Sequence, residues 1–197
     1  YRRERIAFFP LAGGSAVPSD ATGTLPGTVM MAGGFSSATA SNILYRVNAA
    51  GGSLSALDGG RSWESDNSWF STGYHNSGSS TTSYFTSIPV DSTVPTSTPS
   101  SVFNSERYDT GRAGDNGEMK WSFPVTAGTP IAVRLYFAER YWSSVGQRKF
   151  DVAIDGATVL SSFDILAATG RNRGTMREFQ VTSDGTVNID FGHVVDH

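Results

Sequence analysis

The fold of this chain is indicated most clearly by residues 131–137, Ile-Ala-Val-Arg-Leu-Tyr-Phe. Large apolar residues occupy every second position there, which is the period of a β-strand that buries one face. Residues 150–154, Phe-Asp-Val-Ala-Ile, repeat the alternation, and the Asp-Gly pair at 155–156 is typical of a tight hairpin turn. Val159 then returns on the face of Val152. These patterns predict two core strands and a hairpin in a sheet with one buried face.

A loop with two adjacent aromatic residues, Tyr141 and Trp142, joins the first of these strands to the second. Because the flanking strands supply the core, we expect both rings to lie on the loop. Aromatic rings held in place by a rigid sandwich suit the apolar faces of sugars, while nearby polar groups bind the hydroxyls. The alternative is that the rings pack against another loop, since Trp is often largely buried.

Other strands follow the same pattern further along the chain. Alternating apolar residues predict a strand over 119–125, and two more alternating runs predict a last hairpin over 179–191, turned by Asp184 and Gly185. Helix is limited to a turn or two around 162–168, because that segment lacks length and sustained periodicity. The sequence therefore predicts an all-β protein built as an antiparallel β-sandwich.

The composition excludes several classes of protein. A length of 197 residues with 17% charged residues suits one all-β domain with an appendage. The formal net charge is −3 and the basic residues are scattered, so we expect no nucleic acid as a partner and no binding to an anionic membrane. No apolar run approaches the roughly 20 residues of a membrane-spanning helix. The absence of cysteine excludes disulfides and thiolate metal sites.

The chain divides into an N-terminal arm or linker, residues 1–41, and a sandwich domain, residues 42–197. The arm is rich in Gly, Ala, Ser and Thr after an apolar segment at 6–11, which we expect to dock as an edge segment or to pair with another chain. Within the domain, residues 71–102 are rich in Ser and Thr and predict a long ordered loop or short edge strand, anchored by Tyr84, Phe85, Ile88 and Val90.

Several short motifs occur together in this sequence. They are Tyr-Arg-Val-Asn-Ala-Ala-Gly-Gly at 45–52, Ser-Glu-Arg-Tyr at 105–108, Phe-Ala-Glu-Arg-Tyr-Trp at 137–142 with Phe-Asp-Val at 150–152, and Val-Val-Asp-His at 194–197. In this order the set resembles the malectin family of carbohydrate-binding domains, over about residues 43–197. The resemblance implies a jelly-roll sandwich of the galactose-binding-like type and a sugar as ligand.

The resemblance also implies which residues bind. Tyr141 and Trp142 match the family's loop aromatic pair, Tyr108 matches a second aromatic of the cleft, and Asp196 matches the carboxylate that accepts hydrogen bonds from sugar hydroxyls. The family has a further tyrosine where this chain has 63–70, Trp-Glu-Ser-Asp-Asn-Ser-Trp-Phe; no tyrosine occurs there, and Trp69 is the substitute by spacing. With a Trp in place of that Tyr, a glucose-type ligand is replaced by another sugar or lost.

Charged residues near these motifs are expected to have structural roles. We expect an ion pair between Glu106 and Arg107, and a partner for Glu139 in Arg107 or Arg148, because Glu139 continues the buried alternation of its strand. A glycosidase needs two carboxylates flanking the scissile bond, for which Glu106, Glu139, Asp164 and Asp196 are the available pool.

The sequence contains few residues suited to catalysis or to metal binding. It has three histidines, no thiol and no Gly-x-Ser-x-Gly elbow, so we expect no enzyme activity and no cofactor. A structural calcium ion on loop carbonyls with Asp58, Asp66 or Asp109 is compatible with the sequence, which does not locate it.

A sandwich of this type closes with one more strand after the Asp196 segment, and we expect that strand to be missing from this chain. Either the chain is a fragment of a longer polypeptide, as its start at Tyr1 rather than Met also suggests, or a neighbouring chain supplies the strand. Residues 6–11 of another copy are one such source.

The sequence thus favours a non-catalytic glycan-binding module of a larger secreted or cell-surface microbial protein. The alternative is a structural module that builds an extracellular fibre or surface layer from copies of itself, by exchange of edge strands or of the N-terminal arm. A likeness of fold alone does not choose between the two.

Overall fold

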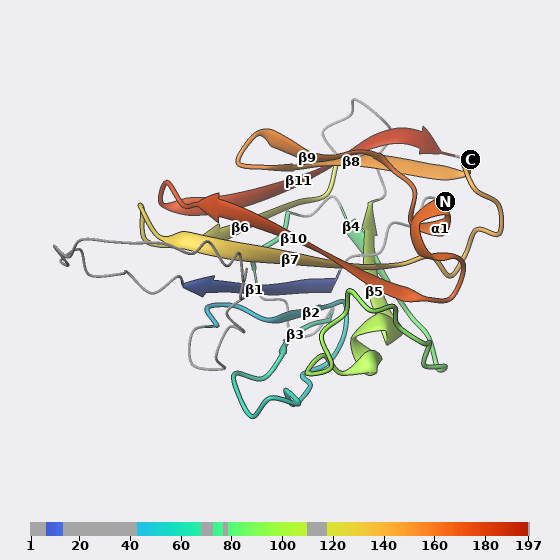
Figure 1. The fold of residues 1–197 in the computed structure, drawn as a ribbon, viewed down its shortest axis with the longest axis horizontal. Coiled ribbons are helices and arrows are strands. Elements are labelled where there is room, and N and C mark those ends of the chain that lie inside the picture. The colour runs from blue at the N-terminus through green and yellow to red at the C-terminus, as the bar shows by residue number, and fades with distance from the viewer. Residues whose placement is uncertain (1–6, 14–42, 68–72, 77–78, 110–117, 197) are drawn as a thin grey trace, which may run out of the picture.

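The protein is a β-sandwich of two larger sheets packed face to face, with a small third sheet beside them (Figure 1). The structure, a computed structural model, describes residues 7–13, 43–67, 73–76, 79–109 and 118–196. The all-β prediction is confirmed. In chain order the elements are β1 Ala7–Gly13, β2 Val47–Ala49, β3 Glu64–Asp66, β4 Ser79–Ser83, η2 Ser100–Asn104, β5 Ser105–Asp109, β6 Lys120–Pro124, β7 Pro130–Ala138, β8 Arg148–Ile154, β9 Ala157–Phe163, α1 Ile165–Thr169, β10 Gly174–Thr182 and β11 Thr186–Asp196.

The strand order is β10-β7-β1-β2-β3 in the five-stranded sheet, β6-β11-β8-β9 in the four-stranded sheet and β4-β5 in the two-stranded sheet. Neighbouring strands run antiparallel, except β2 and β3, which are parallel. The turn at Asp155 and Gly156 joins β8 to β9 with φ values of 49° and 77°. Both values are positive, as a type I′ hairpin turn requires, so the predicted hairpin is confirmed.

The main core lies between the two larger sheets. Its side chains come from the alternating positions that the sequence indicated, and the burial pattern along β6 and β8 alternates strictly. Sandwich cores form in this way because each sheet must cover its apolar face against the other. The largest members of this core that are almost fully buried are Trp121, Phe137, Phe150, Phe191, Met119, Ile131, Leu135, Ile154 and Ile165.

The second half of β7 is buried on both faces. Tyr136 and Ala138, which the alternation places on the outer face, are each only 2% exposed. They belong to a second, smaller core cluster whose other buried members are Trp63, Ile88, Val94, Val102 and Phe103. The expectation of a single buried face is therefore wrong for this part of β7, because a segment distant in sequence covers its other side.

The predicted hairpin over residues 179–191 does not form. β10 pairs with β7 in the five-stranded sheet, whereas β11 pairs with β6 and β8 in the four-stranded sheet. The connection at 183–185 therefore crosses from one sheet to the other. Ser183 holds this crossing, since its hydroxyl donates to the carbonyl oxygen of Val125 at 3.0 Å and accepts from the amide of Gly185 at 3.1 Å.

The Ser/Thr-rich segment forms the short strand β4 and then a loop that covers the second core cluster. Ile88 is buried and Val90 packs against the same cluster, so both are anchors as expected. Phe85 is fully exposed, and its predicted role as an anchor is wrong.

The N-terminal arm contributes β1 to the five-stranded sheet. Its backbone pairs antiparallel with β7 on one side and with β2 on the other. This position is inside the sheet rather than at its edge, where we expected the apolar segment to dock. The rest of residues 1–41 lies outside the described residues.

Helix is confined to the single turn α1 and the 3-10 turn η2 within the described part of the chain. Asp164 caps α1, because its Oδ1 accepts the amide of Ala167 at 3.0 Å. Among the described residues, no helix is long and apolar enough to cross a membrane.

Truncating a side chain of the main core tests this packing. Leu135 is 0% exposed, so Leu135→Ala leaves a cavity between the sheets and should lower the free energy of unfolding by about 2–5 kcal/mol. Urea unfolding at equilibrium measures the change. The exposed Val194 is the matched control, and Val194→Ala should change stability by less than about 0.5 kcal/mol. Equal losses in the two variants would contradict the assignment of the core.

Candidate functional site

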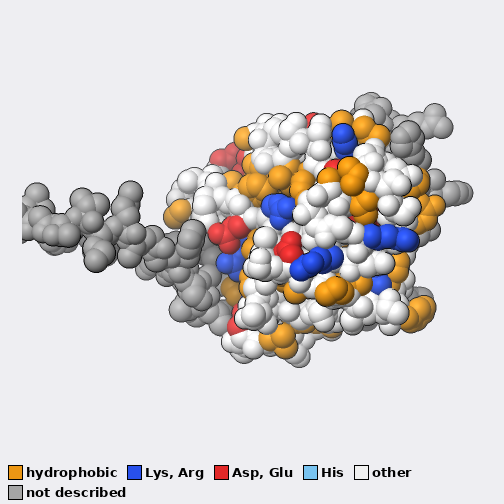
Figure 2. Space-filling view, turned by 45° about the vertical axis from the view of Figure 1, so that its right-hand side comes forward, with side chains coloured by type: hydrophobic (Ala, Val, Ile, Leu, Met, Phe, Trp, Pro, Cys, Tyr) orange, Lys and Arg blue, Asp and Glu red, His pale blue; other side chains and the backbone are white. Residues whose placement is uncertain are grey.

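The loop that carries Tyr141 and Trp142 lies at one end of the sandwich. It leaves the end of β7 and enters the start of β8, and the end of β11 lies beside it, because Asp196 is paired with Arg148. Figure 1 shows this loop, α1 and the end of β11 together at the right. In Figure 2 the molecule is turned so that this side comes forward. Small hydrophobic groups are interspersed with charged side chains on the visible face.

The aromatic pair is accessible and ordered. Tyr141 is 45% exposed and Trp142 is half-buried. The two rings meet edge to face, with centroids 4.9 Å apart and planes at 81°. This arrangement is a favourable one for aromatic pairs, and it fixes the orientation of each ring relative to the other.

A buried carboxylate positions the backbone under this pair. Glu139 Oε1 accepts the backbone amides of Tyr141 at 2.8 Å and Trp142 at 2.9 Å. Its other oxygen, Oε2, accepts from Arg148 Nη1, so the predicted partner for Glu139 is confirmed as Arg148. Both charged side chains are almost fully buried. The start of the loop is thus fixed by hydrogen bonds within the protein.

Arg140 ties this end of β7 to the Ser/Thr-rich segment. Its Nη1 donates to the carbonyl oxygen of Phe103 at 3.0 Å, and its Nη2 donates to the carbonyl and hydroxyl oxygens of Thr86, both at 2.7 Å. The guanidinium carbon lies 4.1 Å from the ring centroid of Tyr84. Burial lowers the pKa of Arg140, because removal from water disfavours the charged form.

A second buried charge cluster joins β3, β5 and the segment 73–76. Arg107 Nε donates to Asp66 Oδ2 at 2.8 Å, and Arg107 Nη2 donates to the carbonyl oxygen of Asp66 at 2.8 Å. His75 Nε2 lies 3.2 Å from Asp66 Oδ1. Burial alone would raise the pKa of Asp66, but the hydrogen bond from His75 and the charge of Arg107 outweigh it and hold that pKa below its ordinary value.

The ion pair expected between Glu106 and Arg107 does not form. Neighbouring residues on a strand point to opposite faces, and Arg107 turns to Asp66 whereas Glu106 Oε1 accepts from the hydroxyl of Tyr84 at 2.9 Å. These bonds give Glu106 and Arg107, both on β5, a structural role.

The remaining predicted site residues are only partly described. Tyr108 lies half-buried on β5 opposite Ser80, and its hydroxyl makes no hydrogen bond with the described residues. For Asp196 the structure gives the backbone alone, paired with Arg148 at the end of β11. Trp69 lies outside the described residues. The structure therefore brings Tyr141, Trp142 and the backbone of Asp196 to the same end of the sandwich, while their convergence with Tyr108 remains a prediction.

The aspartates considered for calcium are engaged with arginines where their side chains are described. Asp58 is paired with Arg46, and this hydrogen bond lowers the pKa of Asp58 to about 2. Asp66 is held by Arg107, and for Asp109 only the backbone is described. In the part of the chain that the structure describes, no group of three or more His, Cys, Asp or Glu residues could hold a metal ion.

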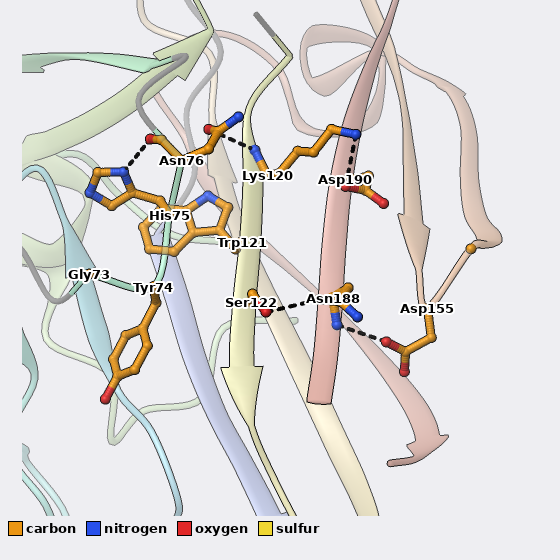
Figure 3. A pocket seen from close by; sticks show the side chains of 11 residues that line it. Gly73, Tyr74, His75, Asn76, Lys120, Trp121, Ser122, Asp155, Asn188 and Asp190 are labelled. Atoms are coloured by element: carbon orange, nitrogen blue, oxygen red, sulfur yellow. Dashed lines mark hydrogen bonds and ion pairs between the residues drawn. The ribbon is translucent and has the colours of Figure 1, made fainter. Parts of the chain in front are cut away.

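A polar hollow that the sequence analysis missed lies on the outer face of the four-stranded sheet (Figure 3). Side chains of β6 and β11 line it, among them Lys120, Ser122, Asn188 and Asp190. The signal in the sequence is the polar half of the two alternating strands, which is also the pattern of an ordinary solvated face. Sequence alone therefore does not distinguish this hollow from plain surface.

The fold is that of an antiparallel β-sandwich domain with a partly exposed aromatic pair on an end loop. Residues 43–197 match the family described as Malectin domain. The chain therefore belongs to the malectin domain family, and the resemblance seen in its motifs is confirmed. No curated protein matches the chain significantly.

Solved structures of plant proteins share the fold. The extracellular domain of ANXUR2 from Arabidopsis thaliana has a TM-score of 0.63 and 20% identity, with 76% of this chain and 43% of that chain covered. The extracellular domain of ANXUR1 from the same plant has a TM-score of 0.62 and 19% identity, with 75% of this chain and 42% of that chain covered. A structure of the plant peptide RALF23 in complex with FER and LLG2 has a TM-score of 0.64 and 21% identity, covering 86% and 50%. This chain thus spans half or less of these chains.

The Asp66 cluster predicts a specific dependence of stability on pH. The pKa of Asp66 is lower in the folded than in the unfolded state, so its contribution to stability is complete above the unfolded pKa and is lost as the pH falls through the folded pKa. Asp66→Asn should cost about 3–5 kcal/mol at pH 7, because Arg107 loses its carboxylate. The variant should also show a shallower loss of stability between pH 5 and pH 2, measured by urea unfolding.

The control for this experiment is Asp184→Asn, which changes an exposed aspartate in the turn before β11. We expect it to shift the unfolding free energy by less than about 0.5 kcal/mol at each pH. If the pH profiles of wild type and Asp66→Asn run parallel, the assigned pKa shift is wrong.

Proposed function

We propose that this domain is a non-catalytic module of a secreted or cell-surface protein and binds a glycan at the loop between β7 and β8. Tyr141 and Trp142 provide the stacking surface, and Asp196 and Tyr108 provide polar contacts. The observation that carries the proposal is the pre-positioned aromatic pair: Glu139 holds both backbone amides, Tyr141 is exposed, and Trp142 is half-buried.

The chemistry of this end of the molecule suits a sugar. Aromatic rings cover the C–H face of a pyranose, and the neighbouring Tyr and Asp groups match its hydroxyls. An open loop site on a sandwich excludes water incompletely, so we expect modest affinity. Three of the four carboxylates available to a glycosidase have structural partners: Glu106 accepts from Tyr84, Glu139 pairs with Arg148, and Asp164 caps α1.

The extracellular setting is part of the proposal. Two of the similar structures are described as extracellular domains. The chain has no cysteine, so its stability outside a cell would come from the packed core rather than from disulfides.

A glycan array with the wild-type domain and Trp142→Ala tests the proposal. We expect the wild type to bind one class of glycan, and Trp142→Ala to weaken that binding about five- to thirtyfold, because the loss of an aromatic contact costs on the order of 1–2 kcal/mol. The matched control is Leu57→Ala, which removes an exposed apolar side chain from the β2–β3 loop and should leave binding unchanged. Absence of binding by the wild type, or equal binding by Trp142→Ala, would falsify the proposal.

A second candidate function is assembly of copies through the N-terminal arm. The observation in its favour is the inner position of β1, which pairs with both β7 and β2. If the β1 of one copy occupies this position in another, copies are linked without any new type of contact. The arm would then serve a fibre or surface layer.

Deletion of residues 1–13 tests the assembly function. The deletion exposes the unpaired edges of β7 and β2, so it should lower the thermal midpoint in either case. If the arm links copies, the full chain should be oligomeric and the truncated chain monomeric, as measured by light scattering over a range of concentrations. A particle size that the truncation leaves unchanged excludes arm exchange.

A further inference from the structure

The outer face of the four-stranded sheet holds a polar hollow of about 530 Å³, within the size range of roughly 300–1,000 Å³ that is usual for small-ligand sites. It lies over β6 and β11, between the segment 73–76 and the β8–β9 turn (Figure 3). Asn188, in this hollow, and Asp196, at the loop end, are eight residues apart along β11, a separation of roughly 26 Å at about 3.3 Å per residue. The hollow is therefore separate from the loop that carries Tyr141 and Trp142.

Two cross-strand polar pairs form the floor of the hollow. Lys120 lies opposite Asp190, and Ser122 lies opposite Asn188. Lys120 Nζ is 3.8 Å from Asp190 Oδ1, and the Ser122 hydroxyl donates to Asn188 Oδ1 at 2.9 Å. These side chains stand on two neighbouring strands of a rigid sheet, which keeps their spacing fixed.

The β8–β9 turn adds a further polar side chain, Asp155, to the same surface. Asp155 Oδ1 accepts the amide of Asn188 at 2.7 Å, and the amide of Asp155 donates to the carbonyl oxygen of Asn188 at 2.9 Å. These bonds clamp the turn onto β11. Asp155 Oδ2, Asp190 Oδ2 and the amide Nδ2 of Asn188 make no hydrogen bond with the described residues, so donors and acceptors remain for a ligand.

An aromatic residue, Tyr74, lies at the edge of the hollow. Tyr74 lines it and also lines a second hollow of about 450 Å³, formed with Tyr45, Arg61 and Thr126 among others. The Tyr74 ring packs in a cluster of three with Tyr45 and Phe123, at centroid distances of 5.2 Å and 4.9 Å. The two hollows adjoin at Tyr74, and together they are called the groove below.

The charges of the first hollow limit the ligand. One lysine, Lys120, and two aspartates, Asp155 and Asp190, line it, so the formal charge of this part is negative and disfavours an anion. Fixed donors and acceptors side by side match a molecule whose groups both donate and accept, as the hydroxyls of a sugar do. Tyr74 lines the hollow at the edge of β6, with its ring packed against Phe123.

We infer that the groove over β6 and β11, with Asn188, Asp155, Asp190, Lys120 and Tyr74 as its contact residues, is a second binding site, for a neutral oligosaccharide. It goes beyond the proposed function, because its residues and its position are independent of the Tyr141–Trp142 loop. Its negative formal charge should also select against anionic sugars such as uronates. A chain with both sites would hold two parts of one polysaccharide, or two strands of a glycan matrix.

The test uses the whole chain and NMR titration with neutral probes, namely cello-, malto- and xylo-oligosaccharides from tri- to hexasaccharides, with oligogalacturonides of equal length as anionic probes. At least one neutral series should shift the side-chain amide of Asn188 and the backbone amides of Lys120 and Ser122. Asn188→Ala should weaken this binding about two- to tenfold, since a neutral sugar loses a fixed donor. Trp142→Ala should leave these shifts unchanged.

Lys120→Ala provides a second variant, because its side chain is largely exposed and its removal leaves the core intact. It should also weaken the neutral series, while both variants keep the wild-type thermal midpoint within a few degrees. The inference is overturned if no neutral probe shifts these amides, if oligogalacturonides bind more tightly, or if Trp142→Ala abolishes the shifts. The indole N–H of Trp142 reports on the loop separately, so failure of either site is recognised by itself.

Discussion

The buried ion pair between Glu139 and Arg148 connects the two sheets at the end where the loop aromatics lie. Glu139 follows β7 of the five-stranded sheet and Arg148 begins β8 of the four-stranded sheet. A buried carboxylate is costly unless both of its oxygens are satisfied, and here one oxygen faces Arg148 while the other accepts the amides of Tyr141 and Trp142. One side chain therefore sets the junction of the sheets and the conformation of the loop together.

Strand β7, which leads to Glu139, packs against two hydrophobic clusters. The main core packs the inner face of β7 against the four-stranded sheet, and the second cluster packs Tyr136 and Ala138 against the segment that ends at Phe103. Arg140 joins the same segment through the carbonyl oxygen of Phe103. The loop end thus rests on backbone that is immobilised from both sides, which is the condition for placing exposed aromatic rings at fixed positions.

The two proposed sites differ in how they are built. The loop site depends on a turn between two sheets and on one carboxylate, whereas the groove depends on side chains in register on β6 and β11 of a single sheet. Membership of the malectin domain family supports the fold. It does not determine the groove, because ligand sites vary independently of the fold that carries them.

The sequence by itself determined the local features of this protein: the alternation in β6, β7 and β8, the hairpin turn at Asp155, and a buried Glu139 with Arg107 or Arg148 as its partner. Each depends on neighbours or on the period of a strand, which sequence records directly. Only the tertiary structure decided that β10 and β11 lie in different sheets, and that Asp66, His75 and Arg107 meet. It alone also revealed that Tyr136 is buried and that the polar faces of β6 and β11 form a hollow. The physical reason is that these contacts join segments far apart in the chain, and an alternating pattern specifies which face of a strand is apolar but not which element covers it.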